Sequence, residues 1–179
     1  MRGHAPGPVT RPLPDPADGQ TAGMQPEREE LLVRRAVRAD AGAVGRLVRT
    51  AYAHYVARIG REPVPMTLDY DRVVARGATW VADVGGRIVG VLVLEHHDDH
   101  VLVENLAVLP DAQGGGVGSH LLRHAEDEAR ARGVREVRLY THELMTENQA
   151  YYPRRGYRET HRSGDTPWRR VFFAKQLSD

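Results

Sequence analysis

The chain has 179 residues, of which 41 % are hydrophobic and 27 % charged, so it is long enough for one domain with a sizeable core. Its 25 Lys and Arg residues balance 24 Asp and Glu residues, and a formal charge of +1 gives no reason to expect nucleic-acid binding. The lack of cysteine excludes disulfides, thiolate nucleophiles and thiolate metal ligands. No apolar run reaches the roughly 20 residues of a membrane helix, and no signal-peptide pattern follows Arg2, so we expect a cytoplasmic protein without membrane contact.

The N-terminal stretch differs from the rest of the chain. Residues 1–26 hold six of the eleven prolines and few large apolar groups. Such a segment buries too little surface to offset its ordering entropy. We predict a disordered tail over residues 1–30 and one folded domain over residues 31–179.

The first half of the domain reads as a strand, two helices and three strands. We expect a strand over 31–35, a helix from Asp40 as N-cap to about residue 59, and a second helix over 68–76 that Thr67 caps. Strands follow over 79–84, 87–95 and 101–108, with tight turns at Gly85-Gly86 and Asp98-Asp99. The middle strand is apolar along its whole length, which is typical of a strand buried on both faces.

The second half begins with a glycine cluster and a strong helix. We expect this helix over about 118–132, a strand over 134–140, a short helix over 145–155, and strands over 157–162 and 170–176. This order of elements predicts an α/β (α+β) domain with one mixed sheet and helices on both faces.

The glycine cluster, residues 113–118, lies between a strand and a helix. Glycines let the backbone approach a ligand closely, and exposed N–H groups at a helix N-terminus bind anions such as a pyrophosphate. The alternative is a flexible connector. A dinucleotide fingerprint fails because Ser119 or Leu121 stands where its last glycine belongs, and a P-loop fails because there is no lysine.

The segment resembles the signature of the GNAT superfamily of acetyltransferases, Gln/Arg-x-x-Gly-x-Gly/Ala, at Gln113, Gly116 and Gly118. The flanking sequences resemble the family too. Asn-x-Ala-Val-x-Pro stands over 105–110, just before the glycine segment, and Asn-x-x-x-Tyr-x-x-x-Gly-Tyr stands downstream of it, over 148–157. The resemblance covers about residues 31–177 and is sharpest over 104–162.

The resemblance implies the GNAT fold: a mixed, mostly antiparallel sheet of about six to seven strands with about four helices, splayed at the cofactor site. Acetyl-coenzyme A is the implied cosubstrate. Its pantetheine arm would pair with strand backbone, its pyrophosphate would lie on the glycine amides, and an N–H near Leu106 would stabilise the oxyanion. The implied cofactor-binding residues are Leu106, Ala107, Val108, Gln113, Gly114, Gly115, Gly116, Val117, Gly118, Ser119, Asn148 and Tyr151.

Two catalytic residues follow from the same resemblance. Tyr152 aligns with the tyrosine that protonates the leaving thiolate, and its alternative role is packing. Pro153 departs from the family pattern and is expected to shorten or kink the helix there. Glu104 is the first candidate for the base that deprotonates the amine, and its alternative is a solvated strand carboxylate. His142 and Glu143 are the other candidates.

Several further residues have weaker assignments. The segment over 60–77 varies in the family, so residues near it are expected to contact the acceptor: Tyr55, Arg58, Arg61, Glu62, Met66 and Tyr70. Trp80 and Trp168 are expected to be packing residues. The histidines and aspartates over 96–100 are interpreted as a polar hairpin tip, and no metal site is expected.

The sequence therefore predicts an acetyl-coenzyme A-dependent N-acetyltransferase, in which the primary amine of a small molecule or peptide attacks the thioester directly. The alternatives are an acyltransferase that uses another acyl-coenzyme A, and a non-catalytic acyl-coenzyme A sensor. The acceptor stays open among aminoglycosides, polyamines, amino acids and protein N-termini. A homodimer, common in the family, is an expectation from the resemblance alone.

Overall fold

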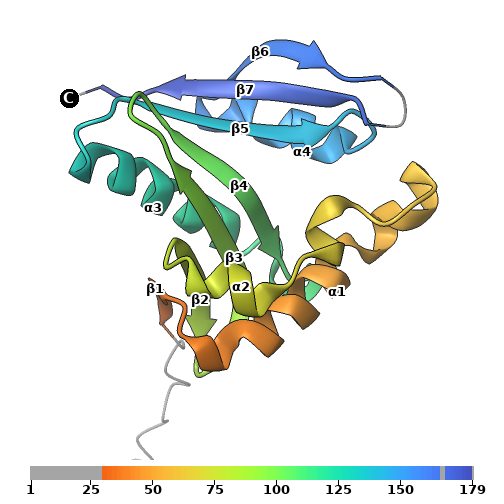
Figure 1. The fold of residues 1–179 in the computed structure, drawn as a ribbon, viewed down its shortest axis with the longest axis vertical. Helices are drawn as coiled ribbons and strands as arrows, with labels where there is room; N and C mark the ends of the chain where they lie inside the picture. The colour runs from red at the N-terminus through yellow and green to blue at the C-terminus, as the bar shows by residue number, and fades with distance from the viewer. Residues whose placement is uncertain (1–29, 166–167, 179) are drawn as a thin grey trace, which may run out of the picture.

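The computed structural model describes residues 30–165 and 168–178. The expected tail lies almost wholly outside the described residues and stays a prediction. The described chain forms one mixed sheet in the order β1-β2-β3-β4-β5-β7-β6, which confirms the expected fold class (Figure 1). The strands are β1 (Leu31–Arg35), β2 (Thr79–Val84), β3 (Arg87–His96), β4 (Val101–Val108), β5 (Glu136–His142), β6 (Arg158–Ser163) and β7 (Arg170–Gln176).

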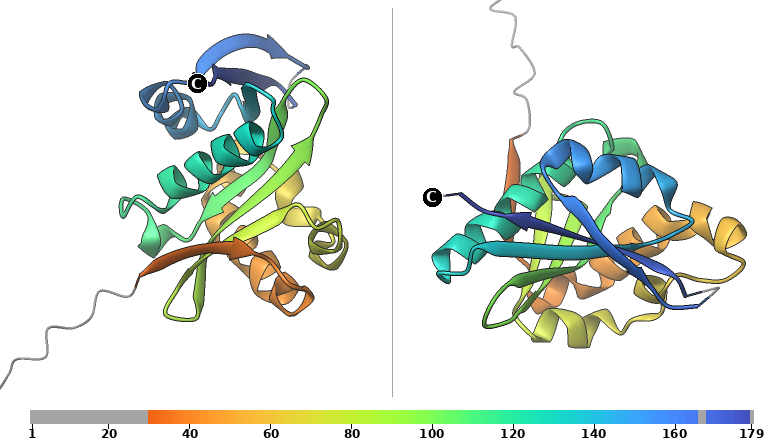
Figure 2. Two further views of the ribbon diagram at one scale, coloured as in Figure 1. Left: turned by 90° about the vertical axis from the view of Figure 1, so that its left-hand side faces the viewer. Right: turned by 90° about the horizontal axis from the view of Figure 1, so that it is seen from above.

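Helices cover both faces of this sheet (Figure 2). They are α1 (Ala41–Ile59), α2 (Tyr70–Ala75), α3 (Val117–Ala131) and α4 (Thr146–Tyr151). Helices α1 and α2 pack on the face to which Val91 and Val93 of β3 point, and α3 packs on the opposite face against Leu92. The buried run of β3 is thus shared between two cores, as its apolar sequence predicts. None of the described helices is long and apolar enough to cross a membrane.

A β-bulge in β4 decides which side chains share a face. Two consecutive residues of β3 pair with Asn105 and Val103, so Glu104 between them has no partner on β3. A bulge of this kind brings two successive side chains to one face of a sheet. The Glu104 carboxylate reaches Arg76 at the end of α2, and the Asn105 amide reaches Tyr70 inside α2. Glu104 and Asn105 therefore both face the α1–α2 side.

Strands β4 and β5 separate soon after they meet (Figure 1). Their parallel ladder joins only Val101–Val103 to Val137–Leu139. Beyond this ladder, β4 continues to Val108 and β5 continues to His142, but the two strands no longer pair with each other. On its other side β5 stays paired with β7 along its whole length. A gap with two open strand edges results.

Of the two expected helix caps, one is confirmed in position only and the other is wrong. Asp40 is the N-cap residue of α1, but its carboxylate accepts the Val37 N–H at 2.8 Å, and no side-chain hydrogen bond caps α1. Thr67 does not cap α2, because it lies within a separate 3-10 turn. Asp69 caps α2 instead, since its carboxylate accepts two amides of the first turn.

The expected helix over 145–155 is divided, as Pro153 predicts. Helix α4 ends at Tyr151 and a 3-10 turn, Pro153–Arg155, follows it, because proline has no N–H to continue the helix. Tyr152 between them keeps helical torsion angles, and its N–H donates to the Asn148 carbonyl at 3.1 Å. The direction of the Tyr152 side chain is therefore still set by α4.

Gly90 marks the closest approach of α3 to β3, and it provides a test of this packing. A Cβ at Gly90 would lie 2.9 Å from Val117 and 3.0 Å from Leu121. We predict that Gly90→Val lowers the free energy of unfolding by about 1–3 kcal/mol through overpacking, measured by urea denaturation. Gly42→Ala is the control, because the nearest atom to its new Cβ lies at 3.5 Å. A G90V variant as stable as the native chain would contradict this packing.

Candidate functional site

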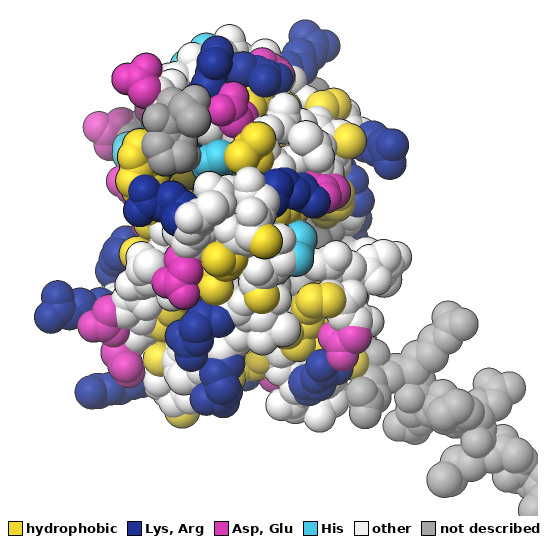
Figure 3. All heavy atoms as spheres, turned by 90° about the vertical axis from the view of Figure 1, so that its right-hand side faces the viewer, with side chains coloured by type: hydrophobic (Ala, Val, Ile, Leu, Met, Phe, Trp, Pro, Cys, Tyr) yellow, Lys and Arg dark blue, Asp and Glu magenta, His cyan; other side chains and the backbone are white. Residues whose placement is uncertain are grey.

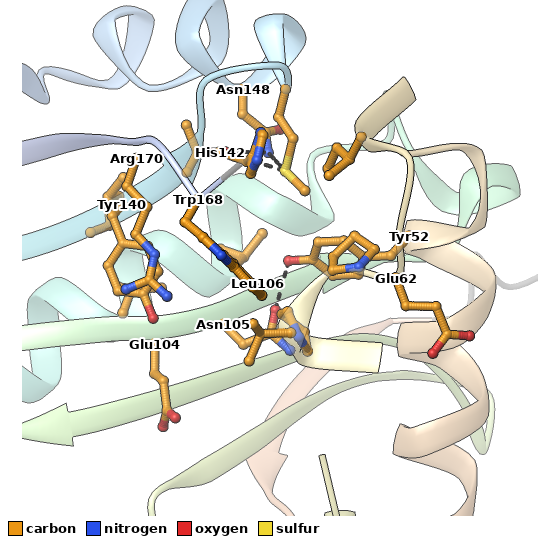
Figure 4. A pocket seen from close by; sticks show the side chains of 18 of the residues that line it. Tyr52, Glu62, Glu104, Asn105, Leu106, Tyr140, His142, Asn148, Trp168 and Arg170 are labelled. Atoms are coloured by element: carbon orange, nitrogen blue, oxygen red, sulfur yellow. Dashed lines mark hydrogen bonds between the residues drawn. The ribbon is translucent and has the colours of Figure 1, made fainter. Parts of the chain in front are cut away.

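Two adjoining pockets lie along the gap between β4 and β5. The larger, the loop pocket, has a volume of about 590 Å³ and is lined by parts of residues 51–55, 106–108, 112–119 and 147–155. The smaller, the aromatic pocket, has a volume of about 110 Å³ and is lined by parts of residues 52–68, 103–106, 139–152 and 168–170 (Figure 4). The residues that line both are Tyr52, Leu106, Asn148 and Tyr152.

The glycine segment forms an anion cradle at the start of α3. The Gln113 side chain donates to the Val108 carbonyl at 3.1 Å, so it ties the loop to β4. Gly116, the N-cap, has a φ of 86°, which side chains rarely adopt. The first backbone bond of α3 joins His120 N–H to the Gly116 carbonyl at 3.0 Å, so the amides of residues 117–119 precede the helical ladder. Such amides bind phosphate groups.

The edge of β4 beside this cradle presents backbone polar groups to the gap. The Leu109 N–H donates to the Val89 carbonyl at 2.9 Å. Because hydrogen-bonded pairs alternate along an antiparallel ladder, the N–H and C=O groups of Leu106 and Val108 point away from β3. The bond from Gln113 to the Val108 carbonyl agrees with this direction. An extended ligand can therefore pair with this edge as an added strand.

Tyr152 stands where the two pockets meet. Its ring packs against Tyr151, Tyr157 and Phe173, with centroids 5.4, 6.1 and 5.6 Å away. Burial raises the pKa of the Tyr152 phenol, which is therefore protonated throughout the neutral range. Within the part of the chain that the structure describes, this hydroxyl forms no hydrogen bond to another residue, so its proton is available to a ligand.

The aromatic pocket contains a carboxylate from β4, a phenol from β5 and a cation from β7. The Glu104 carboxylate accepts a hydrogen bond from Arg76 at 3.4 Å, and its side chain is 23 % exposed. Tyr140 points toward β4 on the side where Glu104 leaves the strand (Figure 4). Burial raises the pKa of Tyr140, which the Arg170 cation lowers and the Glu104 charge raises. The Arg170 guanidinium stacks on the Tyr140 ring, 4.4 Å from its centroid.

A buried hydrogen-bond chain holds the wall of this pocket. Asn105, only 3 % exposed, accepts from the Tyr52 hydroxyl at 2.8 Å (Figure 4). Its amide donates to the Tyr70 hydroxyl at 3.2 Å, which in turn donates to the Pro65 carbonyl at 2.9 Å. These hydrogen bonds link α1, β4, α2 and the segment before α2. They therefore fix the pocket wall at Pro65 to β4, the strand that carries Glu104.

A basic groove of about 320 Å³ continues from the loop pocket. The two share Ser119, Arg154 and Arg155, and Arg123 and Lys175 line the far part. Arg155 donates to the Ser119 hydroxyl at 2.9 Å, and Lys175 is paired with a buried glutamate. The groove thus extends the anion cradle with positive charge.

The structure brings together most of the residues assigned to cofactor binding. Those that line the loop pocket are Leu106, Ala107, Val108, Gln113, Gly114, Gly116, Val117, Gly118, Ser119, Asn148 and Tyr151. Gly115 does not line it. Of the two catalytic candidates, Glu104 lies in the aromatic pocket and Tyr152 lies in both pockets.

The residues expected around the acceptor are only partly in place. Of the six, Arg61 and Glu62 line the aromatic pocket, Tyr55 lines the loop pocket, and Arg58, Met66 and Tyr70 line neither. The expectation that Trp168 is a packing residue is wrong, because this side chain is 48 % exposed and lines the aromatic pocket. Trp80 is buried, as expected.

The pocket residues that the sequence analysis missed include Tyr52, Tyr140 and Arg170. The only signal for Tyr140 and Arg170 is that each lies near one end of its strand. Tyr52 looked like an ordinary helix residue, since Tyr55 carries the apolar stripe of α1. Among residues 30–165 and 168–178, no group of three or more His, Asp and Glu side chains is placed to hold a metal ion.

Comparisons with known proteins agree with this geometry. Residues 46–157 match the family model described as the Acetyltransferase (GNAT) family. The aminoalkylphosphonate N-acetyltransferase of Salmonella typhimurium is 34 % identical over 82 residues, which are 42 % of this chain and 53 % of that protein. The chain thus matches about half the length of this curated relative.

Solved structures share the fold. The PaiA N-acetyltransferase of Thermoplasma acidophilum, in complex with coenzyme A, superimposes with a TM-score of 0.72 at 17 % identity, covering 83 % of this chain and 99 % of that one. The putative acetyltransferase yncA of Salmonella typhimurium, with acetyl-CoA, gives a TM-score of 0.64 at 21 % identity, covering 84 % and 95 %. At these identities the likeness is one of fold.

The hydrogen-bond chain through Asn105 can be tested by stability. Tyr70→Phe removes the hydroxyl that accepts from Asn105 and donates to Pro65. Because Asn105 is buried, we predict a loss of about 1–3 kcal/mol in the free energy of unfolding, measured by urea denaturation. Tyr55→Phe is the control, since the Tyr55 phenol takes no part in these hydrogen bonds. Equal losses of stability in both variants would show that these hydrogen bonds do not fix the pocket wall.

Proposed function

This chain belongs to the GNAT acetyltransferase family, and we propose that it transfers the acetyl group of acetyl-coenzyme A to the primary amine of a small acceptor. The observation that carries the proposal is the union, in one pocket of about 590 Å³, of an open β4 edge and a helix-start anion cradle. An extended arm and a pyrophosphate need these two features side by side. The loop pocket is thus the donor site, and the aromatic pocket is the acceptor site.

The donor site fits coenzyme A along its length. Backbone groups of Leu106 and Val108 would pair with the pantetheine arm, and the amides of residues 117–119 would hold the pyrophosphate. The basic groove at Arg123 and Arg154 would receive the remaining phosphate of the nucleotide. When bound, the cosubstrate supplies an acetyl thioester as the electrophile. Its acetyl end would lie near Leu106, which lines both pockets.

The residues at the junction then divide the proton transfers. Glu104 takes a proton from the acceptor ammonium, so that the amine nitrogen is free to attack the thioester carbon. The Leu106 N–H, directed into the gap, stabilises the negative charge that develops on the acetyl oxygen. As the N–C bond forms and the C–S bond breaks, Tyr152 donates its phenolic proton to the leaving sulfur. The nitrogen of the new amide then loses its second proton, which returns through solvent to Tyr152, and Glu104 releases its own proton to solvent.

Contacts of the other base candidates favour Glu104. The Glu143 carboxylate pairs with Arg169 at 3.6 Å, and Glu143 does not line the aromatic pocket. His142 lines the pocket, but its Nδ1 accepts the Leu144 N–H at 3.1 Å. In the neutral ring Nε2 then carries the proton and donates rather than accepts. Glu104 holds only a long contact to an exposed arginine, so its carboxylate can accept a proton.

The size of the aromatic pocket supports a small acceptor. Its volume of about 110 Å³ offers room for on the order of ten water-sized groups. The name of the Salmonella relative states that it acetylates an aminoalkylphosphonate, a small amine. Transfer of another acyl group and a non-catalytic sensor are the alternatives that the tests below address. The homodimer and the cytoplasmic location stay predictions.

Gly116 provides a test of the donor site. We predict that Gly116→Asp abolishes binding of acetyl-coenzyme A in calorimetric titration, because it places a negative side chain in the anion cradle. Gly60→Asp is the matched control, since Gly60 has a similar φ of 80° with no atom within 4 Å of its Cβ position, and it lies outside both pockets. Full affinity in a folded G116D variant would overturn the donor-site assignment.

Tyr152 separates an enzyme from a sensor. We predict that Tyr152→Phe lowers kcat by about 10²–10⁴-fold while the affinity for acetyl-coenzyme A is unchanged, measured by thiol release and calorimetry. Tyr157→Phe is the control, because that buried phenol touches the same ring but bonds to Glu126 outside both pockets. An unchanged kcat in the Tyr152 variant would remove the acid role. No turnover of any amine by the native chain would favour the sensor.

A further inference from the structure

The aromatic pocket carries two arginines that no acid of the described chain neutralises. Arg170 stacks on Tyr140 at 4.4 Å, and Arg61 stacks on Trp168 at 3.7 Å, both measured from the guanidinium carbon to the ring centroid. Both arginines line the pocket. Neither forms an ion pair within residues 30–165 and 168–178, whereas Arg58, Arg76 and Arg169 nearby each pair with an acid.

The stacking orients each guanidinium, and its N–H groups form no hydrogen bond to another residue within the described ranges. An aromatic face contacts the guanidinium plane, so the N–H groups at its edge stay free to bind an anion in the same plane. Arg170 is half-buried, which strengthens its field inside the pocket. A planar fork of this kind matches the two oxygens of a carboxylate or phosphonate. The pocket is therefore equipped for an anion that the described chain does not supply.

The acidic residues of the pocket do not neutralise these two arginines. Glu104 accepts its hydrogen bond from Arg76, which does not line the pocket. The Glu62 carboxylate points away from Arg170 and Trp168, as Figure 4 shows. Outside the pocket the charges are mixed: the face in Figure 3 shows basic and acidic side chains interspersed, without a continuous basic field. The unpaired arginines are thus a feature of the pocket itself.

We propose that the acceptor is a small amine that carries its own anionic group, and that Arg170 and Arg61 bind this anion while the amine lies at Glu104. The inference rests on the proposed function, because it names the acceptor class of that same site. Glu104 lies on β4 and Arg170 lies on β7, which is paired with β5 on the other side of the gap. Both line the same pocket, so a short zwitterion spans from one to the other. The pocket volume of about 110 Å³ limits the linker between amine and anion to a few atoms.

Arg170 and Arg61 are specificity residues in this scheme, and neither takes part in the proton transfers. Loss of either should raise KM for anionic amines far more than KM for an uncharged amine. A purely structural role would instead change both substrates alike. The proposal can therefore be tested by the ratio of kcat/KM for an anionic amine to kcat/KM for an uncharged amine, measured on one protein preparation.

The first experiment compares acceptors by thiol release from acetyl-coenzyme A. The probes are 2-aminoethylphosphonate, β-alanine and taurine, each with an anion two carbons from the amine, and propylamine, of similar length without an anion. We expect kcat/KM for at least one anionic probe to exceed that of propylamine by about 10²-fold or more, since paired charge-assisted bonds are involved. Comparison among the three anions identifies the oxygen geometry that the arginines prefer. Propylamine used as well as every anionic probe would overturn the proposal.

The second experiment uses variants. Arg170→Gln and Arg61→Gln should each reduce the preference for the anionic probe by about 10-fold or more through KM, because a charged hydrogen bond is lost. Arg169→Gln is the matched control: it removes the neighbouring arginine, which pairs with Glu143 and does not line the pocket. An unchanged preference in both pocket variants, or an equal loss in R169Q, would contradict the assignment.

A binding measurement separates this inference from the proposed function. Ethylphosphonate, which lacks the amine, is titrated calorimetrically into the native chain without coenzyme, then into R170Q and R169Q. Binding that only R170Q weakens supports the anion site whatever the catalytic result. Turnover of propylamine with no ethylphosphonate binding would leave the acetyltransferase intact and remove the anion site. Failure of acetyl-coenzyme A to bind the native chain would remove the proposed function, while the ethylphosphonate result would still decide the anion site.

Discussion

The site depends on the short pairing between β4 and β5. Three residues of each strand form the parallel ladder, and the strands then separate while β5 remains fully paired with β7. The bulge at Glu104 lies directly after Val103, the last residue of β4 that pairs with β5. A bulge bends and twists the strand that carries it. The sheet thus opens at the point where its backbone polar groups become available. Open strand edges inside a protein need partners, and a ligand arm that pairs as a strand is one.

The same bulge distributes side chains between two tasks. Because Glu104 and Asn105 share a face, one is free to meet a ligand while the other is buried and holds the wall of the aromatic pocket. Tyr52 and Tyr152 show a similar division at the junction. Burial raises the pKa of both phenols. The Tyr52 hydroxyl is committed to Asn105, whereas the Tyr152 hydroxyl keeps its proton for the junction of the pockets. Two chemically alike phenols thus differ in that one is bound within the fold and the other is available for the proposed proton transfer.

The sequence predicted the elements whose signals are local. The apolar run of β3, the glycine loop before α3 and the break at Pro153 each follow from a few adjacent residues. It failed where the outcome depends on competition between neighbours. Asp40 had a nearer partner in the Val37 N–H than in the amides of α1, and Thr67 was drawn into a 3-10 turn that left Asp69 as the cap.

The donor site was easier to predict than the acceptor site for the same reason. The glycine loop and the end of β4 are almost contiguous in the chain, so one motif describes them. The aromatic pocket is assembled from α1, β4, β5 and β7, whose residues meet only in the fold. Trp168 was interpreted as a packing residue because an isolated tryptophan usually is one. Its exposure depends on where the chain just before β7 lies relative to the aromatic pocket, which no local pattern encodes.

Opposite charges coexist in the aromatic pocket around Tyr140. Arg170 lowers the pKa of this phenol and Glu104 raises it, so its hydroxyl lies in the field of both. Within the described residues the two charged groups do not form an ion pair with each other. A direct pair would neutralise both and leave the pocket without a base or an anion site. Because they are not paired with each other, the carboxylate remains able to take a proton from an ammonium and the guanidinium remains able to bind an anion. In the scheme proposed above, the stacking of Arg170 on Tyr140 holds the cation for the anionic end of the acceptor, while Glu104 meets the ammonium end.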